Sequence, residues 1–170
     1  MKMSDKLAAA YSEQVTMELS SSVAYLQMSA WFDRADLPGM ASWMRIQSEE
    51  ERLHALRFID FMINRGNSVV IGSVPAPAAE FASPRKCFEA ALGHERAVSA
   101  SIRTIYKLAS EEGDVESFTL LEWFLNEQVE EEATVEKILG QLGHVGDDGS
   151  ALLLLDRELA ARTLSAPPGG

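Results

Sequence analysis

Cysteine is almost absent from this chain of 170 residues. Its one cysteine, Cys87, cannot form a disulfide within the chain, which fits a reducing compartment. Long apolar runs are also missing, since the stretch at residues 151–155 is far too short to span a bilayer. Asp5 and Lys6 stand where a secretory signal peptide would need an apolar segment. We therefore expect a cytoplasmic protein with no membrane association.

Basic residues are scarce compared with acidic ones. The chain has 15 Lys and Arg against 26 Asp and Glu, which gives a formal net charge of −11. This balance argues against sequence-independent binding to nucleic acid, which needs a basic surface. An acidic surface can attract cations, but such surfaces are common and also keep proteins soluble. The charge therefore excludes one class of partner without identifying a function.

Glycine and proline are concentrated at a few positions, and these divide the chain into five segments of helical character. The N-caps are expected at Ser4 or Asp5, at Ser83, and at Asp147 or Asp148. A turn is expected at Leu37-Pro38-Gly39, and a long connection at residues 67–82. The predicted helices cover approximately residues 5–33, 40–65, 84–111, 115–139 and 150–163.

Two short turns and one long connection among four long helices predict two antiparallel hairpins joined by a crossover. The expected fold class is therefore all-α: a four-helix bundle at residues 1–146, with one long crossover connection. Residues 147–165 are expected to form a short fifth C-terminal helix that packs on other subunits, and residues 166–170 to be disordered. The apolar runs at residues 69–71 and 152–155 cannot enter a closed four-helix core, so they predict a homo-oligomer.

Each of the four long helices carries one glutamate on a stripe that is otherwise apolar. Positions seven apart share one face of a helix in a bundle. At that spacing, an apolar or aromatic residue stands two turns before and two turns after each glutamate. The four sets are Tyr11, Glu18, Tyr25 and Phe32; Met44, Glu51 and Phe58; Phe88, Glu95 and Ile102; and Phe124, Glu131 and Ile138.

The four glutamates are also expected at a similar depth in the bundle. Glu95 and Glu131 each lie about 16 residues from the turn between their helices, which is roughly 24 Å at the rise of an α-helix. Glu18 and Glu51 lie about 15 and about 12 residues from their own turn. Four carboxylates are therefore predicted to meet near the middle of one core.

A polyvalent cation offsets the repulsion among buried carboxylates better than shared protons do. His54 stands three residues after Glu51, so both side chains project from the same side of the helix. A Glu-x-x-His pair with glutamates from other helices is the ligand pattern of di-iron and di-manganese bundles. Oxygen ligands with one imidazole suit iron or manganese better than structural zinc. A di-iron or di-manganese oxidase, and a purely structural bundle with protonated glutamates, remain as alternatives.

Four segments resemble the helices of ferritins. They are YSEQVTMELSSSVAY at residues 11–25, SEEERLHA at 48–55, HER at 94–96 and LNEQVEEE at 125–132. The resemblance covers the whole chain and is to non-haem ferritins of prokaryotic type. Bacterioferritins are an alternative, but they hold haem through a methionine where this chain has Arg52. They also carry a second Glu-x-x-His where this chain has Glu127 followed by Glu130. Both departures argue against haem.

The resemblance implies an iron-storage and detoxification protein of 24 identical subunits. It further implies a ferroxidase centre at which Fe(II) is oxidised by O2 and from which Fe(III) passes to a mineral inside the cage. Glu18, Glu51 and His54 would hold the first iron, with Glu51 bridging, and Glu95 and Glu131 would hold the second.

Other residues acquire roles only through this resemblance. Gln128 matches a glutamine that forms hydrogen bonds near the iron pair, and Tyr25 matches a tyrosine beside it that can supply an electron. A third iron site would be built from Glu50, Glu127 and Glu130, with Glu131 shared. A solvated acidic surface explains Glu50 and Glu130 almost equally well, because Arg57 and Lys137 follow them at the same spacing.

Overall fold

Five helices make up the regular structure of residues 1–164, the part of the chain that the computed structural model describes. They are α1 (Asp5–Arg34), α2 (Pro38–Asn64), α3 (Pro84–Glu112), α4 (Glu116–Val145) and α5 (Gly149–Leu159). The predicted all-α fold class is confirmed. Within residues 1–164, none of these helices combines the length and the hydrophobicity that crossing a membrane requires. The disorder predicted for residues 166–170 lies outside the described part.

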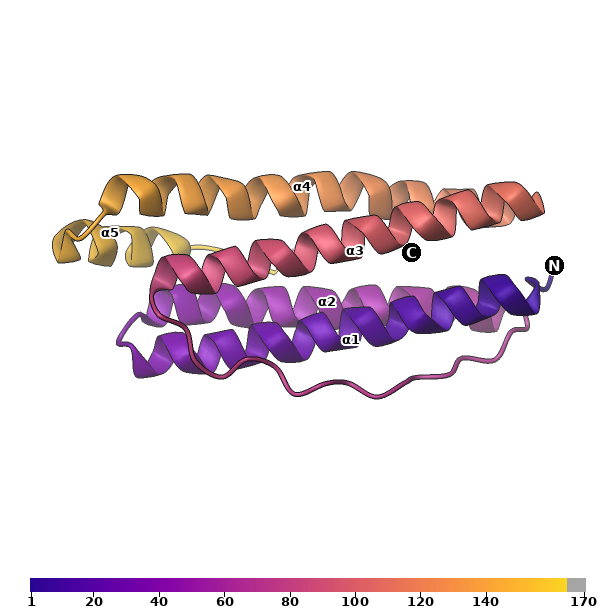
Figure 1. Ribbon diagram of the computed structural model, residues 1–170, viewed down its shortest axis with the longest axis horizontal. Helices are drawn as coiled ribbons and strands as arrows, with labels where there is room; N and C mark the ends of the chain where they lie inside the picture. Colours follow the sequence, from indigo (N-terminus) through magenta and orange to yellow (C-terminus); the bar gives the residue numbers. More distant parts are fainter. Residues whose placement is uncertain (165–170) are drawn as a thin grey trace.

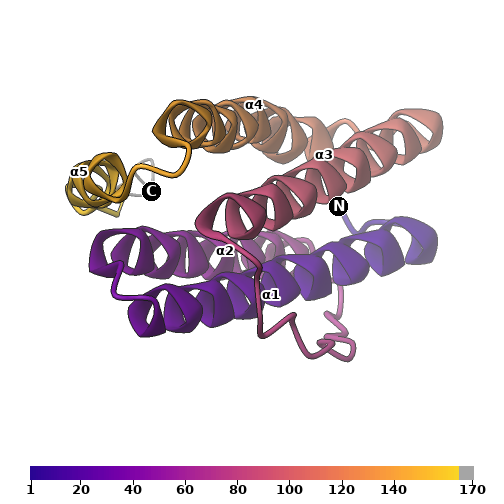
Figure 2. The ribbon, with the colours of Figure 1, turned by 60° about the vertical axis from the view of Figure 1, so that its left-hand side comes forward.

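The helices form two antiparallel hairpins, α1 with α2 and α3 with α4, which pack against each other (Figure 1). The connection between α2 and α3 runs beside α1 along the length of the bundle, as the rotated view also shows (Figure 2). Two side chains of α1 hold it in place: Ser12 Oγ accepts a hydrogen bond from Val70 N at 3.2 Å, and Thr16 Oγ1 accepts one from Gly72 N at 2.9 Å. The predicted crossover topology is confirmed.

Helix α3 begins and ends where the sequence predicts. Ser83 is its N-cap, with Oγ accepting a hydrogen bond from Lys86 N, and Pro84 is the first helical residue. Gly113 ends the helix in the left-handed conformation, with φ of 67°.

The turn predicted at Leu37-Pro38-Gly39 was wrong. Pro38 and Gly39 form the first turn of α2, where the fixed φ of proline is already suitable. The chain reverses one residue earlier, at Asp36, which has a positive φ of 57°. Gly39 is required for a different reason: a Cβ atom at this position would lie 1.8 Å from the backbone oxygen of Asp156 in α5.

Helix α4 is longer than predicted, because Gly140 and Gly143 do not end it. A glycine inside a helix costs about 1 kcal/mol relative to alanine, which packing can offset. The helix continues to Val145, and Gly146, with φ of 53°, follows as its C-cap. Helix α5 is capped by Asp148, as predicted, but ends at Leu159 rather than near Thr163.

Helix α5 packs on α2 and α4 of its own subunit, so the prediction that residues 152–155 stay out of this core was partly wrong. Leu155 and Leu159 are buried with the core residues at that end of the bundle. Leu153 and Leu154 point outward and are 51% and 65% exposed. Val70 and Ile71 of the crossover are also exposed. Exposed apolar residues therefore remain both in the crossover and in α5.

A buried carboxylate attaches α5 to the start of α2. Asp156 is 4% exposed, and its Oδ2 and Oδ1 accept hydrogen bonds from the backbone N–H groups of Gly39 at 3.0 Å and Met40 at 2.8 Å. These donors belong to the first turn of α2 and have no partner within that helix. Asp156 thus acts as an N-cap supplied from a distant part of the chain.

We predict that Asp156→Ala lowers the thermal unfolding midpoint, because two buried N–H groups lose their acceptors at a cost of about 1–3 kcal/mol. Differential scanning calorimetry checks this. Asp147→Ala, which removes an exposed carboxylate from the same segment, is the matched control and should leave the midpoint unchanged. Equal midpoints for the two variants would contradict the capping role.

Candidate metal centre

The four predicted stripes are buried, as the heptad spacing indicates. Their apolar members lie in the core, and Glu18, Glu51, Glu95 and Glu131 are 0%, 1%, 1% and 6% exposed. Each glutamate comes from a different helix of the bundle. The structure therefore brings four carboxylates into one interior, although such groups are rarely buried without a partner.

These carboxylates form a polar layer that separates two apolar clusters. The His54 ring faces this layer and packs edge-on against Trp123 and Phe124, with centroid distances of 5.6 Å and 5.4 Å. Apolar packing on both sides limits the access of water to the layer. The largest residues of the two clusters include Phe32, Met44 and Phe88 on one side and Tyr11, Phe58 and Phe124 on the other.

Glu18, Glu51 and His54 form one group with the geometry of a metal site. One ligand atom from each lies within 4.8 Å of the others. His54 Nδ1 stands 3.6 Å from Glu51 Oε2, which is beyond hydrogen-bond distance. Within the described residues, Glu18 Oε2 and His54 Nδ1 are buried and have no hydrogen-bond partner. Unpartnered ligand atoms aimed at one point are what a cation would satisfy.

His54, Glu127 and Glu131 form a second group within the same distance limit. Glu95 belongs to neither group, and two other residues hold its carboxylate. Tyr25 donates its hydroxyl hydrogen to Glu95 Oε1, and Gln128 Nε2 donates to Glu95 Oε2 at 3.1 Å. Tyr25 and Gln128 thus lie beside the polar layer and contact one of its carboxylates.

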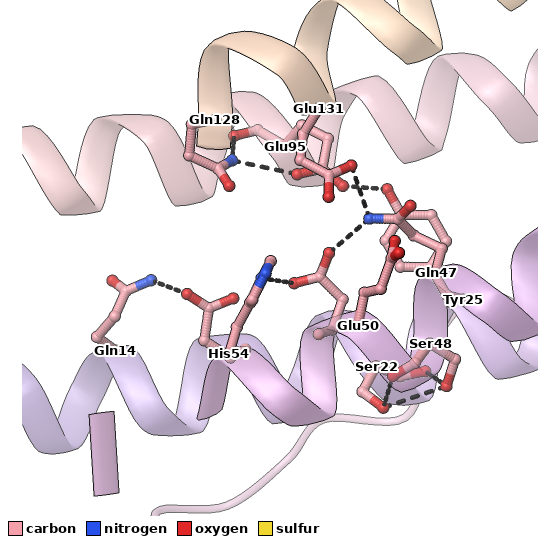
Figure 3. Close-up of polar contacts among 12 residues, drawn as sticks. Gln14, Ser22, Tyr25, Gln47, Ser48, Glu50, His54, Glu95, Gln128 and Glu131 are labelled. Atoms are coloured by element: carbon pink, nitrogen blue, oxygen red, sulfur yellow. Dashed lines mark hydrogen bonds and ion pairs between the residues drawn. The ribbon is translucent and has the colours of Figure 1, made fainter. Parts of the chain in front are cut away.

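Two further glutamines contact the carboxylates, and the sequence analysis missed both. Gln14 Nε2 donates to Glu18 Oε1 at 2.8 Å. Gln47 Nε2 donates to Glu51 Oε1 and to Glu131 Oε2, both at 2.9 Å, and so reaches across from α2 to α4 (Figure 3). Each glutamine precedes its glutamate by four residues, a spacing that places both on one helix face and that could have identified them.

The residues predicted for a third iron site differ in their surroundings. Glu50 is buried and forms an ion pair with Arg162. Glu127 is half-buried, and burial raises its pKa. Glu130 is exposed. The structure therefore brings Glu127 close to the main centre, pairs Glu50 with the guanidinium of Arg162 and leaves Glu130 at the surface.

Burial makes most of these carboxyl groups difficult to ionise. It raises the pKa of Glu18 well above its usual value, with the charge of Glu51 adding to the effect. Burial and the charges of Glu95 and Glu51 raise the pKa of Glu131, and burial and Glu51 raise that of Glu95 to about 8. Glu51 differs: burial opposes its ionisation, but the interaction with His54 lowers its pKa. Burial likewise opposes the charged form of His54, but the interaction with Glu51 raises the pKa of His54.

These shifts favour an ionised Glu51–His54 pair and the protonated forms of Glu18, Glu95 and Glu131. A divalent or trivalent cation would displace those protons and compensate the resulting charges. The donor set is carboxylate oxygen with one imidazole nitrogen, which suits iron or manganese. The residues present fit such an ion.

The chain is similar to ferritins over nearly its whole length. A family model described as a ferritin-like domain matches residues 8–145. A bacterial non-heme ferritin of Staphylococcus epidermidis is 36% identical over 163 residues, which are 96% of this chain and 98% of that protein. A probable bacterial non-heme ferritin-like protein of Haemophilus influenzae is 32% identical over 92% of this chain and 95% of its own. An open-pore ferritin from the archaeon Archaeoglobus fulgidus has a TM-score of 0.94 and 38% identity, covering 95% of this chain and 100% of that one.

We predict that the metal-free protein loses thermal stability as the pH rises from about 5 to about 8. In this window the folded chain binds more protons than the unfolded chain at Glu18, Glu95 and Glu131, so the free energy of unfolding falls. His54 contributes with the same sign, and Glu51 is ionised in both states. Calorimetry in the presence of a chelator measures the trend, and Glu95→Gln should flatten it. Stability that increases across this range would show that these carboxyls are not held protonated.

Proposed function

The chain belongs to the ferritin family of iron-storage proteins, and we propose that it oxidises Fe(II) with O2 at the buried Glu/His centre and retains the Fe(III) as a mineral inside a protein cage. One observation carries the proposal: each of the four bundle helices contributes one buried glutamate to the same polar layer, next to His54. Neither a structural core nor a surface acidic patch needs that arrangement.

Glu18, Glu51 and His54 would bind one iron, because their ligand atoms already converge. Glu131 would bind the second iron with Glu95, once Glu95 turns from Tyr25 and Gln128. Glu127 lies near Glu131 and His54 and is available to either ion or to a third. Iron supplies the redox chemistry when bound, and the negative carboxylates favour Fe(III) over Fe(II).

The remaining residues of the centre orient ligands and control protons. Gln14 and Gln47 each donate to one oxygen of a carboxylate and leave the other oxygen available. Protonated carboxyls must release their protons when Fe(II) binds, so the uptake of iron is coupled to proton release. Tyr25 contacts Glu95 and would supply an electron to the centre.

Storage requires an oligomer, and we propose a cage of 24 subunits. The exposed apolar residues of two segments support burial against neighbouring subunits: Val70 and Ile71 in the crossover, and Leu153 and Leu154 in α5. Exposed apolar patches of this kind mark interaction surfaces.

We predict that Glu51→Ala abolishes rapid Fe(II) oxidation, because Glu51 is the ionised ligand at the middle of the centre. Stopped-flow absorbance measures the rate, and size-exclusion chromatography with an iron-to-protein ratio reports assembly and iron loading. Glu49→Ala removes an exposed carboxylate two positions away and is the matched control, expected to oxidise iron normally. An assembled Glu51→Ala cage that oxidises Fe(II) at the full rate would refute the assignment. A wild-type particle that never accumulates many irons per subunit would instead favour a di-iron oxidase.

We predict that Tyr25→Phe changes the kinetics of oxidation but not the stoichiometry of Fe(II) binding. The variant keeps the buried ring and removes the hydroxyl that donates to Glu95. Anaerobic Fe(II) titration and stopped-flow oxidation separate the two effects. Unchanged oxidation kinetics would leave Tyr25 as an aromatic residue of the core with no part in the reaction.

A further inference from the structure

Arg162 connects the segment after α5 to the metal centre. Its Nη2 atom donates to Gln47 Oε1 at 2.7 Å and also pairs with the carboxylate of Glu50. Its guanidinium lies over the Trp43 ring, 4.2 Å from the centroid, and its side chain is only 19% exposed. A planar cation stacked on an aromatic ring and bound at its edge has little freedom to move.

Arg162 determines which way the amide of Gln47 faces. A guanidinium has only hydrogen-bond donors, so the amide oxygen must face it. The amide NH2 group is then directed the other way, toward the centre. Both of its hydrogens are used there, one for Glu51 Oε1 and one for Glu131 Oε2, each at 2.9 Å. Without Arg162, the amide could rotate and present its oxygen to two carboxylates.

The link matters because side chains alone join the two helices concerned. No Cα atom of α2 lies within 8 Å of a Cα atom of α4, and the structure describes both helices in full. Gln47 spans this gap and holds a ligand from each helix. The orientation of one amide thus affects the separation of Glu51 and Glu131.

We propose that Arg162 is a positioning residue of the iron centre, acting through Gln47 to hold Glu51 and Glu131 at the separation that two ions require. The proposal rests on the proposed function, since it takes this centre to bind iron. Arg162 does not contact the ions. It orients the amide of Gln47, which donates hydrogen bonds to the ligands Glu51 and Glu131. The loss of a residue that orients metal ligands typically weakens metal affinity by about 10–100-fold.

A double-mutant cycle tests the proposal on the assembled protein. Anaerobic isothermal titration calorimetry with Fe(II) alone measures the affinity for Fe(II). It is applied to the wild type, Arg162→Ala, Gln47→Met and the double variant. Each single variant should bind Fe(II) about 10–100-fold more weakly. The double variant should be no weaker than Gln47→Met, because Arg162 has no effect once its target is gone. Arg157→Ala removes an exposed arginine from α5 and should bind as wild type does.

Each outcome decides the question. Equal affinities for Arg162→Ala and wild type overturn the proposal, as do effects of Arg162 and Gln47 that simply add, since Arg162 would then act through Glu50. If Gln47→Met does not assemble, the comparison of Arg162→Ala with Arg157→Ala decides alone, and equal affinities overturn the proposal. If the wild-type protein assembles but binds no Fe(II), the proposed function is refuted. If the wild type and Arg162→Ala bind Fe(II) equally, only the role of Arg162 is refuted.

Discussion

Four carboxylates cannot stay buried and ionised together without a compensating positive charge, and the rest of the structure is arranged around this constraint. Glu18, Glu51, Glu95 and Glu131 occupy one layer between two apolar clusters. The interaction of His54 with Glu51 favours a positive charge on His54, and burial favours the protonated forms of Glu18 and Glu131. The buried layer lowers the stability of the metal-free fold, and a bound cation would compensate the negative charge of its carboxylates. The same burial that costs stability would therefore favour the binding of a cation.

Hydrogen-bond donors around the layer limit that cost. Gln14, Gln47 and Gln128 direct amide NH2 groups at the carboxylates, and Tyr25 directs its hydroxyl. Gln14 and Gln47 each satisfy one oxygen of a carboxylate and leave another for a ligand bond, whereas Tyr25 and Gln128 together bind both oxygens of Glu95. The contact of Arg162 with Gln47 extends the same network to the segment beyond α5. The segment that follows α5 thus contacts the network around the centre.

Much of the fold and the centre follows from local patterns in the sequence. Heptad spacing identified the buried glutamates, and Ser83 and Gly113 marked the ends of α3, because caps and helix faces depend on near neighbours. Pro38 was misread because proline suits both a turn and a first helical turn. Asp156 and Arg162 could not be predicted, since their partners Gly39 and Gln47 are more than a hundred positions away. Such contacts exist only after the bundle has folded.

The function proposed above requires the buried glutamates and His54 to bind iron. Crystals of the assembled protein soaked anaerobically in Fe(II), with anomalous diffraction recorded at the iron edge, test it most directly. Strong peaks are expected inside the bundle, one among Glu18, Glu51 and His54 and one beside Glu131. Iron found only at exposed acidic residues, with the interior layer empty, would contradict it.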